Sequence, residues 1–132
     1  MGILKTFSLS VVCGLSFAPP ASSEPWLVTE TAICAGRLSA ELQHKWLIQA
    51  RDADETQAAR DAMLSRLEAL KGAHDAALLA VRIEAKHAHA ALLQQASFSG
   101  NAAQARWAAT QARRQAATCK RLVQGYLEAN AS

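Results

Sequence analysis

No proline follows Pro25, and alanine supplies 28 of the 109 residues from Glu24 to the C-terminus. Alanine, leucine, glutamine, arginine and glutamate are strong helix formers. The clusters of valine, isoleucine, threonine and aromatic residues that favour strands do not occur in this stretch. Because an interior proline would break a helix, its absence permits long uninterrupted helices. The sequence therefore predicts an all-α fold.

The first 23 residues have the three regions of a secretory signal peptide. Residues 1–5 carry the positive charge of Lys5, and residues 6–18 form an apolar run of about 13 residues. Ala21 and Ser23 then occupy positions −3 and −1 if cleavage follows Ser23. The apolar run is shorter than the roughly 20 residues that a transmembrane helix needs. We therefore expect export to the periplasm or the outside, with a mature single helical domain of residues 24–132 and no transmembrane anchor.

Cleavage would also change the cysteine count. It removes Cys13 and leaves Cys34 and Cys119, and it lowers the formal net charge from +3 to +2 because Lys5 is the only charged residue lost. Two cysteines allow one pairing, and exported proteins meet an oxidising environment. The sequence therefore predicts a disulfide between Cys34 and Cys119.

The positions of caps and breaks predict four helices. These cover about residues 31–49, 52–71, 75–95 and 101–128, with Asp52 and Asp75 as candidate N-caps, a stop at Gly72 and a loop at residues 98–101. Short connections favour an antiparallel, up-down-up-down bundle, which brings the start of the first helix beside the end of the last. The alternative is a three-helix arrangement, with one long central helix over residues 52–96 that continues through Gly72.

Helical periodicity predicts which side chains form the core. We expect its large members to be Leu42, Trp46, Met63, Leu67 and Ile83. The helix over residues 75–95 is apolar on two faces, which are Ala76, Ala80, Ile83 and Ala90 on one and Val81, Ala85, Ala88 and Leu92 on the other. The last helix carries a stripe of small residues, which permits close approach of a neighbouring helix.

A repeated Glu-x-x-His pattern is the one indication of a metal site. Glu41 and His44 form the first pair, and Glu84 and His87 form the second. Such pairs, with single carboxylates from two other helices, build the di-iron centre of ferritin-like bundles, and the resemblance extends to this motif alone. The last helix offers no acidic residue before Glu128, and Glu41 and His44 fall on the polar sector of their helix. We therefore expect no metal and no cofactor.

Two other chemistries receive little support. A haem held between Met63 and His87 has no specific motif behind it, so a metal- or haem-binding bundle is kept only as the alternative function. No serine lies in a nucleophile-elbow sequence, and the two cysteines are expected to be bridged. The sequence therefore indicates that the protein is not an enzyme.

The last predicted helix has a basic face with an aromatic edge. From Ala96 onward the chain has five basic residues and one acidic residue, whereas residues 24–95 have eight and ten. The candidate contact surface consists of Arg106, Trp107, Arg113, Arg114, Lys120 and Arg121. A surface of this kind binds an acidic protein or an anionic envelope surface. We expect a binding or interaction module that uses this face, and export argues against nucleic acid as its partner.

Overall fold

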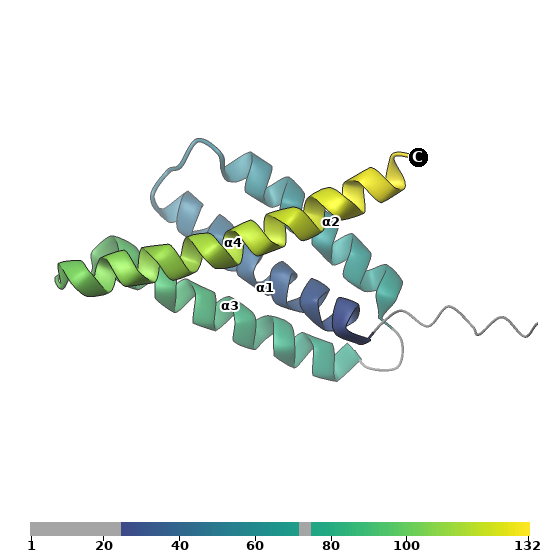
Figure 1. Cartoon of the computed structure of the whole chain (residues 1–132), viewed down its shortest axis with the longest axis horizontal. Coiled ribbons are helices and arrows are strands. Elements are labelled where there is room, and N and C mark those ends of the chain that lie inside the picture. Colours follow the sequence, from purple (N-terminus) through teal and green to yellow (C-terminus); the bar gives the residue numbers. More distant parts are fainter. Residues whose placement is uncertain (1–24, 72–74) are drawn as a thin grey trace, which may run out of the picture.

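The computed structural model describes residues 25–71 and 75–132, which form four helices and no strand. The helices are α1 (Pro25–Leu47), α2 (Ala53–Leu70), α3 (Asp75–Phe98) and α4 (Ala102–Asn130) (Figure 1). The predicted fold class and helix number are confirmed. The alternative of one long helix over residues 52–96 is wrong, because α2 ends at Leu70 and the backbone of Lys71 is extended. The predicted signal peptide and Gly72 lie outside the described residues.

The helix ends differ from prediction in ways that local chemistry explains. Helix α1 begins at Pro25, six residues earlier than expected, because proline fits the first turn of a helix, where its missing N–H is not needed. The same helix ends where Gln49 adopts a left-handed conformation with φ 55°. The N–H of Ala50 then donates to the carbonyl of Lys45 (2.9 Å), which closes a Schellman-type cap.

Local contacts also explain the N-terminal ends of the later helices. The side chain of Asn101 accepts a hydrogen bond from the N–H of Gln104 and so caps α4. Asp52 occupies the N-cap position of α2, as predicted, but its side chain makes no capping hydrogen bond. Its carboxylate instead accepts a hydrogen bond from the ammonium of Lys45 (2.6 Å). Asp75 is the first residue of α3 rather than the residue before it.

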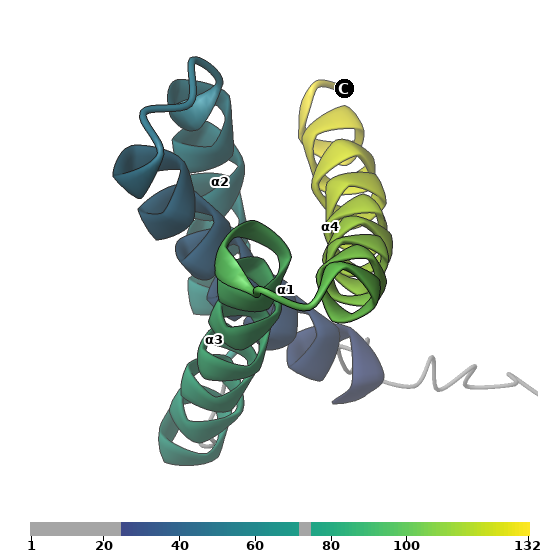
Figure 2. The ribbon, with the colours of Figure 1, turned by 90° about the vertical axis from the view of Figure 1, so that its left-hand side faces the viewer.

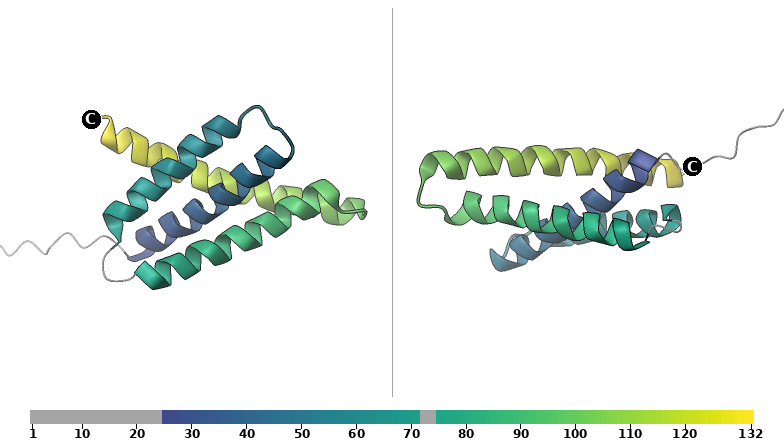
Figure 3. Two further views of the ribbon diagram at one scale, coloured as in Figure 1. Left: turned by 180° about the vertical axis from the view of Figure 1, so that it is seen from behind. Right: turned by 90° about the horizontal axis from the view of Figure 1, so that it is seen from below.

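Helix α1 is the centre of the molecule. It contacts the other three helices, whereas α2 and α3 flank it on opposite sides and make no contact with each other over the described residues. Figure 3 shows this layer from behind, with α1 between α2 and α3, and Figure 2 shows α4 on one side of the layer. The molecule therefore has two layers rather than a square bundle, and α4 crosses the layer on the side of α1 that α2 and α3 leave open.

The predicted disulfide joins the two layers. Cys34 of α1 and Cys119 of α4 are bonded, with their Cα atoms 5.3 Å apart. Both residues are fully buried, and they form one cluster with Leu38, Met63 and Val123. The predicted pairing is confirmed, but Cys34 lies near the middle of α1 rather than in its first turn, because α1 begins earlier than expected.

The large core residues are only partly those expected. Leu42, Met63 and Leu67 are buried, but Trp46 is 53% exposed and Ile83 is 44% exposed. Trp46 lies in the last turn of α1. Ile83 belongs to a face of α3 that points away from α1.

The most deeply buried side of α3 lies beside the second predicted face, of which Val81 and Leu92 pack against the edge of the core. Its buried residues are Leu78, His89 and Leu93. Gly36 explains why, because it brings the backbone of α1 against that of α3. A Cβ atom added to Gly36 would overlap the carbonyl oxygen of Arg82 and lie 3.1 Å from the nitrogen of Lys86. This contact fixes which side of α3 faces α1.

Candidate functional site

The basic face of α4 is the candidate site, and we define it as Arg106, Arg113, Arg114, Lys120 and Arg121. All five residues are exposed, and Trp107 beside them is 56% exposed. The opposite side of α4 packs into the molecule through Ala108, Ala112, Cys119 and Val123. Residues seven apart on a helix differ by only about 20° in direction, so Arg106, Arg113 and Lys120 form one line along it. Helix geometry and burial therefore direct these cations outward together.

Two arginines of the basic face donate hydrogen bonds to neutral hydroxyls. The guanidinium of Arg113 donates to Thr110 Oγ1 (3.4 Å), and that of Arg121 donates to Thr118 Oγ1 (3.3 Å). Within the part of the chain that the structure describes, none of the five cations of the basic face forms an ion pair. The face therefore keeps its positive charge available for an anion from outside.

One carboxylate lies within electrostatic range of the basic face. The pKa of Asp52 is lowered, chiefly because its carboxylate accepts the hydrogen bond from Lys45, and the charge of Lys120 contributes a smaller part. Because Asp52 is already bonded to Lys45, it balances little of the charge of Lys120. The charge of Lys120 is therefore only weakly screened by Asp52.

The four candidate metal ligands do not form a metal site. Glu41 is hydrogen-bonded to His89 rather than to a metal partner, and His44 contacts Ser97 (3.0 Å) and the ring of Phe98. Glu84 and His87 are exposed on α3. Over residues 25–71 and 75–132, no three or more His, Cys, Asp or Glu side chains are placed to share a metal ion.

The residues considered for haem are also apart. Met63 is fully buried beside the disulfide on α2, whereas His87 is exposed on α3. Helices α2 and α3 do not contact each other over the described residues. The structure therefore does not bring this pair together.

A buried polar network that the sequence did not predict links three helices. His89 of α3 is fully buried; its Nε2 lies 2.8 Å from Glu41 Oε1 of α1, and its Nδ1 lies 2.8 Å from Gln115 Oε1 of α4. Glu41 was expected on the polar sector of its helix, and this is wrong, because its side chain is only 16% exposed. The position of His89 on the same side of α3 as Leu78 and Leu93 is the sequence signal that could have found it. The network holds α4 in place beyond the disulfide.

We expect Gln115→Ala to lower the free energy of unfolding by about 1 kcal/mol, because it removes a hydrogen-bond partner of a buried imidazole. Gln124→Ala is the matched control, since Gln124 is exposed on the same helix. Urea unfolding followed by circular dichroism measures both. Equal midpoints for the two variants would show that the Gln115 contact contributes nothing.

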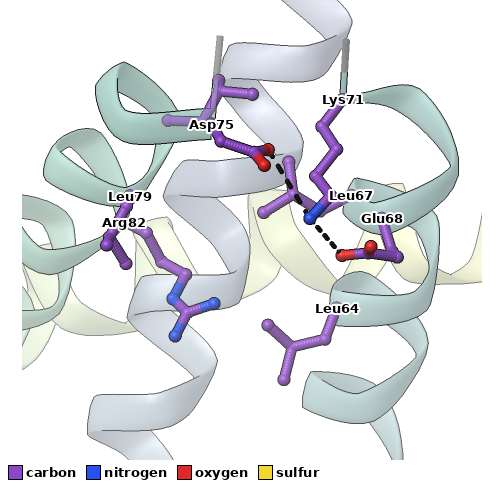
Figure 4. Close-up of a pocket in the computed structure, with 8 residues that line it drawn as sticks. Leu64, Leu67, Glu68, Lys71, Asp75, Leu79 and Arg82 are labelled. Atoms are coloured by element: carbon purple, nitrogen blue, oxygen red, sulfur yellow. Dashed lines mark ion pairs between the residues drawn. The ribbon is translucent and has the colours of Figure 1, made fainter. Parts of the chain in front are cut away.

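A cleft lies between α2 and α3 on the side of α1 away from α4 (Figure 4). It has a volume of about 300 Å³ and is lined by Leu64, Leu67, Glu68, Lys71, Asp75, Leu78, Leu79 and Arg82. Lys71 bridges Glu68 (2.7 Å) and Asp75 (3.5 Å), and the bond to Glu68 is the main reason that the pKa of Lys71 is raised. The carboxylates of the cleft are thus already paired, and its lining within the described residues includes no histidine, cysteine or serine.

Comparison of the chain with protein-family models, with curated proteins and with solved structures finds no match.

Proposed function

We propose that this protein is an exported, non-enzymatic binding module and that the basic face of α4 contacts a polyanionic partner in the periplasm or outside the cell. The observation that carries the proposal is the set of five exposed cations on one helix, none of which is ion-paired within the described residues. Elsewhere in the described structure, Lys45, Arg60 and Lys71 each pair with a carboxylate. The basic face gathers five such unpaired cations on one helix, which favours association with an anion.

The disulfide supports export. Such bonds form and persist in oxidising compartments, and they are rare where thiols are kept reduced. The bond between Cys34 and Cys119 therefore agrees with a signal peptide that is removed after Ser23, leaving residues 24–132 as one domain. None of the four described helices combines the length and the apolar character needed to span a bilayer.

Charge reversal on the basic face tests the proposal. We expect Arg113→Glu/Arg114→Glu to weaken binding of the exported form of the protein to immobilised heparin, a polyanion, by about tenfold or more. Two favourable charges become repulsive, and each cation near an anionic surface contributes about 1 kcal/mol. The measurement is the dissociation constant at 0.1 M salt, and binding of the unaltered protein should decrease further as added salt screens the charges.

The control is Arg60→Glu/Arg82→Glu, which changes the net charge by the same amount on α2 and α3. Arg82 lines the cleft on the side away from α4. This variant should keep heparin affinity within about threefold, since charges farther away than about 10 Å are largely screened at 0.1 M salt. An equal loss in both double variants would mean that net charge alone governs binding, and the proposed site would then be rejected.

A further inference from the structure

The exposed side of α4 places its large apolar residues at the ends and its cations between them. Trp107 is 56% exposed near the start of the helix, and Leu127 is 53% exposed near its end. At a rise of 1.5 Å per residue they are about 30 Å apart along the helix axis. On the helical wheel, Trp107 borders Arg114 on one edge of the basic face, and Leu127 borders Lys120 on the other.

The residues between the cations are small. Thr110 and Ala117 lie along the centre line of the basic face, and the hydroxyls of Thr110 and Thr118 donate back to the helix carbonyls of Arg106 (3.0 Å) and Arg114 (3.1 Å). No large side chain of α4 therefore stands between the arginines. Their long side chains can extend to a flat surface along about 22 Å of helix, the distance from residue 106 to residue 121.

This arrangement differs from that of a protein-binding hot spot. In protein interfaces, the aromatic and arginine anchors gather at the centre, in pockets from which water is excluded. Here the centre of the face carries charge and small residues, and the tryptophan lies at the rim. Helices that lie on a bilayer have this pattern, with arginine and lysine at the lipid phosphates and tryptophan or leucine at the boundary with the acyl chains.

We infer that the polyanionic partner is the surface of a bilayer containing anionic phospholipid, on which α4 lies parallel to the membrane plane. This inference rests on the proposed function and names its partner. The inference depends on charge complementarity. The basic face has five cations, and the one acidic residue of α4 is Glu128, near the end of the helix. The side of α4 opposite the basic face is attached to the other helices through the disulfide, so the rest of the domain would lie on the side away from the lipid.

Vesicle binding tests the inference with a reporter on α4. Trp26 and Trp46, which are 58% and 53% exposed, are changed to phenylalanine so that Trp107 is the only tryptophan. With vesicles of phosphatidylglycerol and phosphatidylcholine in a 3:7 ratio, we expect about a 10 nm blue shift of Trp107 emission, because indoles enter the interface. Lipids brominated near the headgroup should quench this emission, and 0.5 M salt should abolish binding.

Variants separate a specific contact from general attraction. Arg113→Glu/Arg114→Glu should lower the partition coefficient on the mixed vesicles by at least about thirtyfold. Loss of each cation costs about 1 kcal/mol, which is roughly a fivefold factor, and the two new carboxylates add repulsion. Arg60→Glu/Arg82→Glu should change it by less than about threefold. Vesicles of phosphatidylcholine alone should not shift the emission.

The outcomes distinguish the inference from the proposed function. Heparin binding that depends on Arg113 and Arg114, without any binding to phosphatidylglycerol vesicles, would overturn the lipid surface as partner and leave the binding module intact. Absence of both heparin binding and vesicle binding would overturn the lipid surface as partner and the proposed binding module alike. Equal binding to neutral and anionic vesicles, or vesicle binding that Arg113→Glu/Arg114→Glu does not affect, would overturn the role of the basic face at the membrane.

Discussion

Replacing Cys34 and Cys119 with alanine is expected to lower the free energy of unfolding by about 4 kcal/mol. The bond joins residues separated by 85 positions, and in the chain-entropy model closing a loop of that length restricts the unfolded chain by about this amount. Small domains have a total stability of about 5–15 kcal/mol, so the loss is a large share of it. Alanine keeps the site apolar, which limits the additional cost to the small cavity left by the two buried sulfur atoms.

The structure also indicates where this loss acts. Besides the bond, three contacts hold the second half of α4. Val123 packs against the cluster around Met63. Arg66 donates a hydrogen bond to the carbonyl of Leu122 (3.4 Å) and lies above the ring of Tyr126, 5.3 Å from its centroid. These are weak contacts. We therefore expect amide hydrogen exchange in residues 116–130 to increase more than in α1.

Urea unfolding of the oxidised protein, the reduced protein and the double alanine variant measures the effect. The reduced protein and the variant should unfold at similar urea concentrations, both well below that of the oxidised protein. Because both sulfurs are fully buried, reduction by dithiothreitol should require partial unfolding and should accelerate in urea. Coincident unfolding curves for all three samples would contradict the stabilising role of the bond.

The fold class was predictable because it depends on local properties. Alanine and the other helix formers determine helix content position by position, and the caps and breaks near residues 50, 72 and 100 separate four segments. The disulfide was predictable for a different reason, since removal of the predicted signal peptide would leave two cysteines and one possible pairing. The position of the basic face on α4 was predictable because helical periodicity alone determines which residues share a direction.

The arrangement of the helices was not predictable, because alanine does not specify a face. Helix α3 has alanine on every side, so its periodicity fits several orientations. The predicted faces include none of its buried residues Leu78, His89 and Leu93, and only Val81, Ala90 and Leu92 of those faces pack at the edge of the core. The orientation is determined by the contact of Gly36 with the backbone of α3. A single glycine inside a helix forms no periodic pattern, so the sequence does not indicate which helix it contacts. For the same reason the role of Glu41 was missed, since its partner His89 is recognisable only once α1 and α3 are aligned.

Gly36→Ala should therefore destabilise the protein by about 3 kcal/mol, although alanine is the better helix former by about 1 kcal/mol. The added Cβ would overlap the carbonyl oxygen of Arg82, which is backbone and cannot rotate away as a side chain could. Relief requires α1 and α3 to separate, which loosens the packing of Ala32 against Leu78 and the bond between Glu41 and His89. Overpacking of this kind typically costs about 1–3 kcal/mol, and a backbone obstacle places the cost at the upper end.

Gly125→Ala is the matched control, because the same substitution is made inside a helix but meets no atom within 4 Å. Here the helix preference of alanine acts alone, and we expect a gain in stability of about 1 kcal/mol at most, reduced by the position of Gly125 near the end of α4. The two variants should thus shift the urea midpoint in opposite directions. If Gly36→Ala also stabilised the protein, α1 and α3 could not approach as closely as described, and the position of His89 between Glu41 and Gln115 would have to be reconsidered with it.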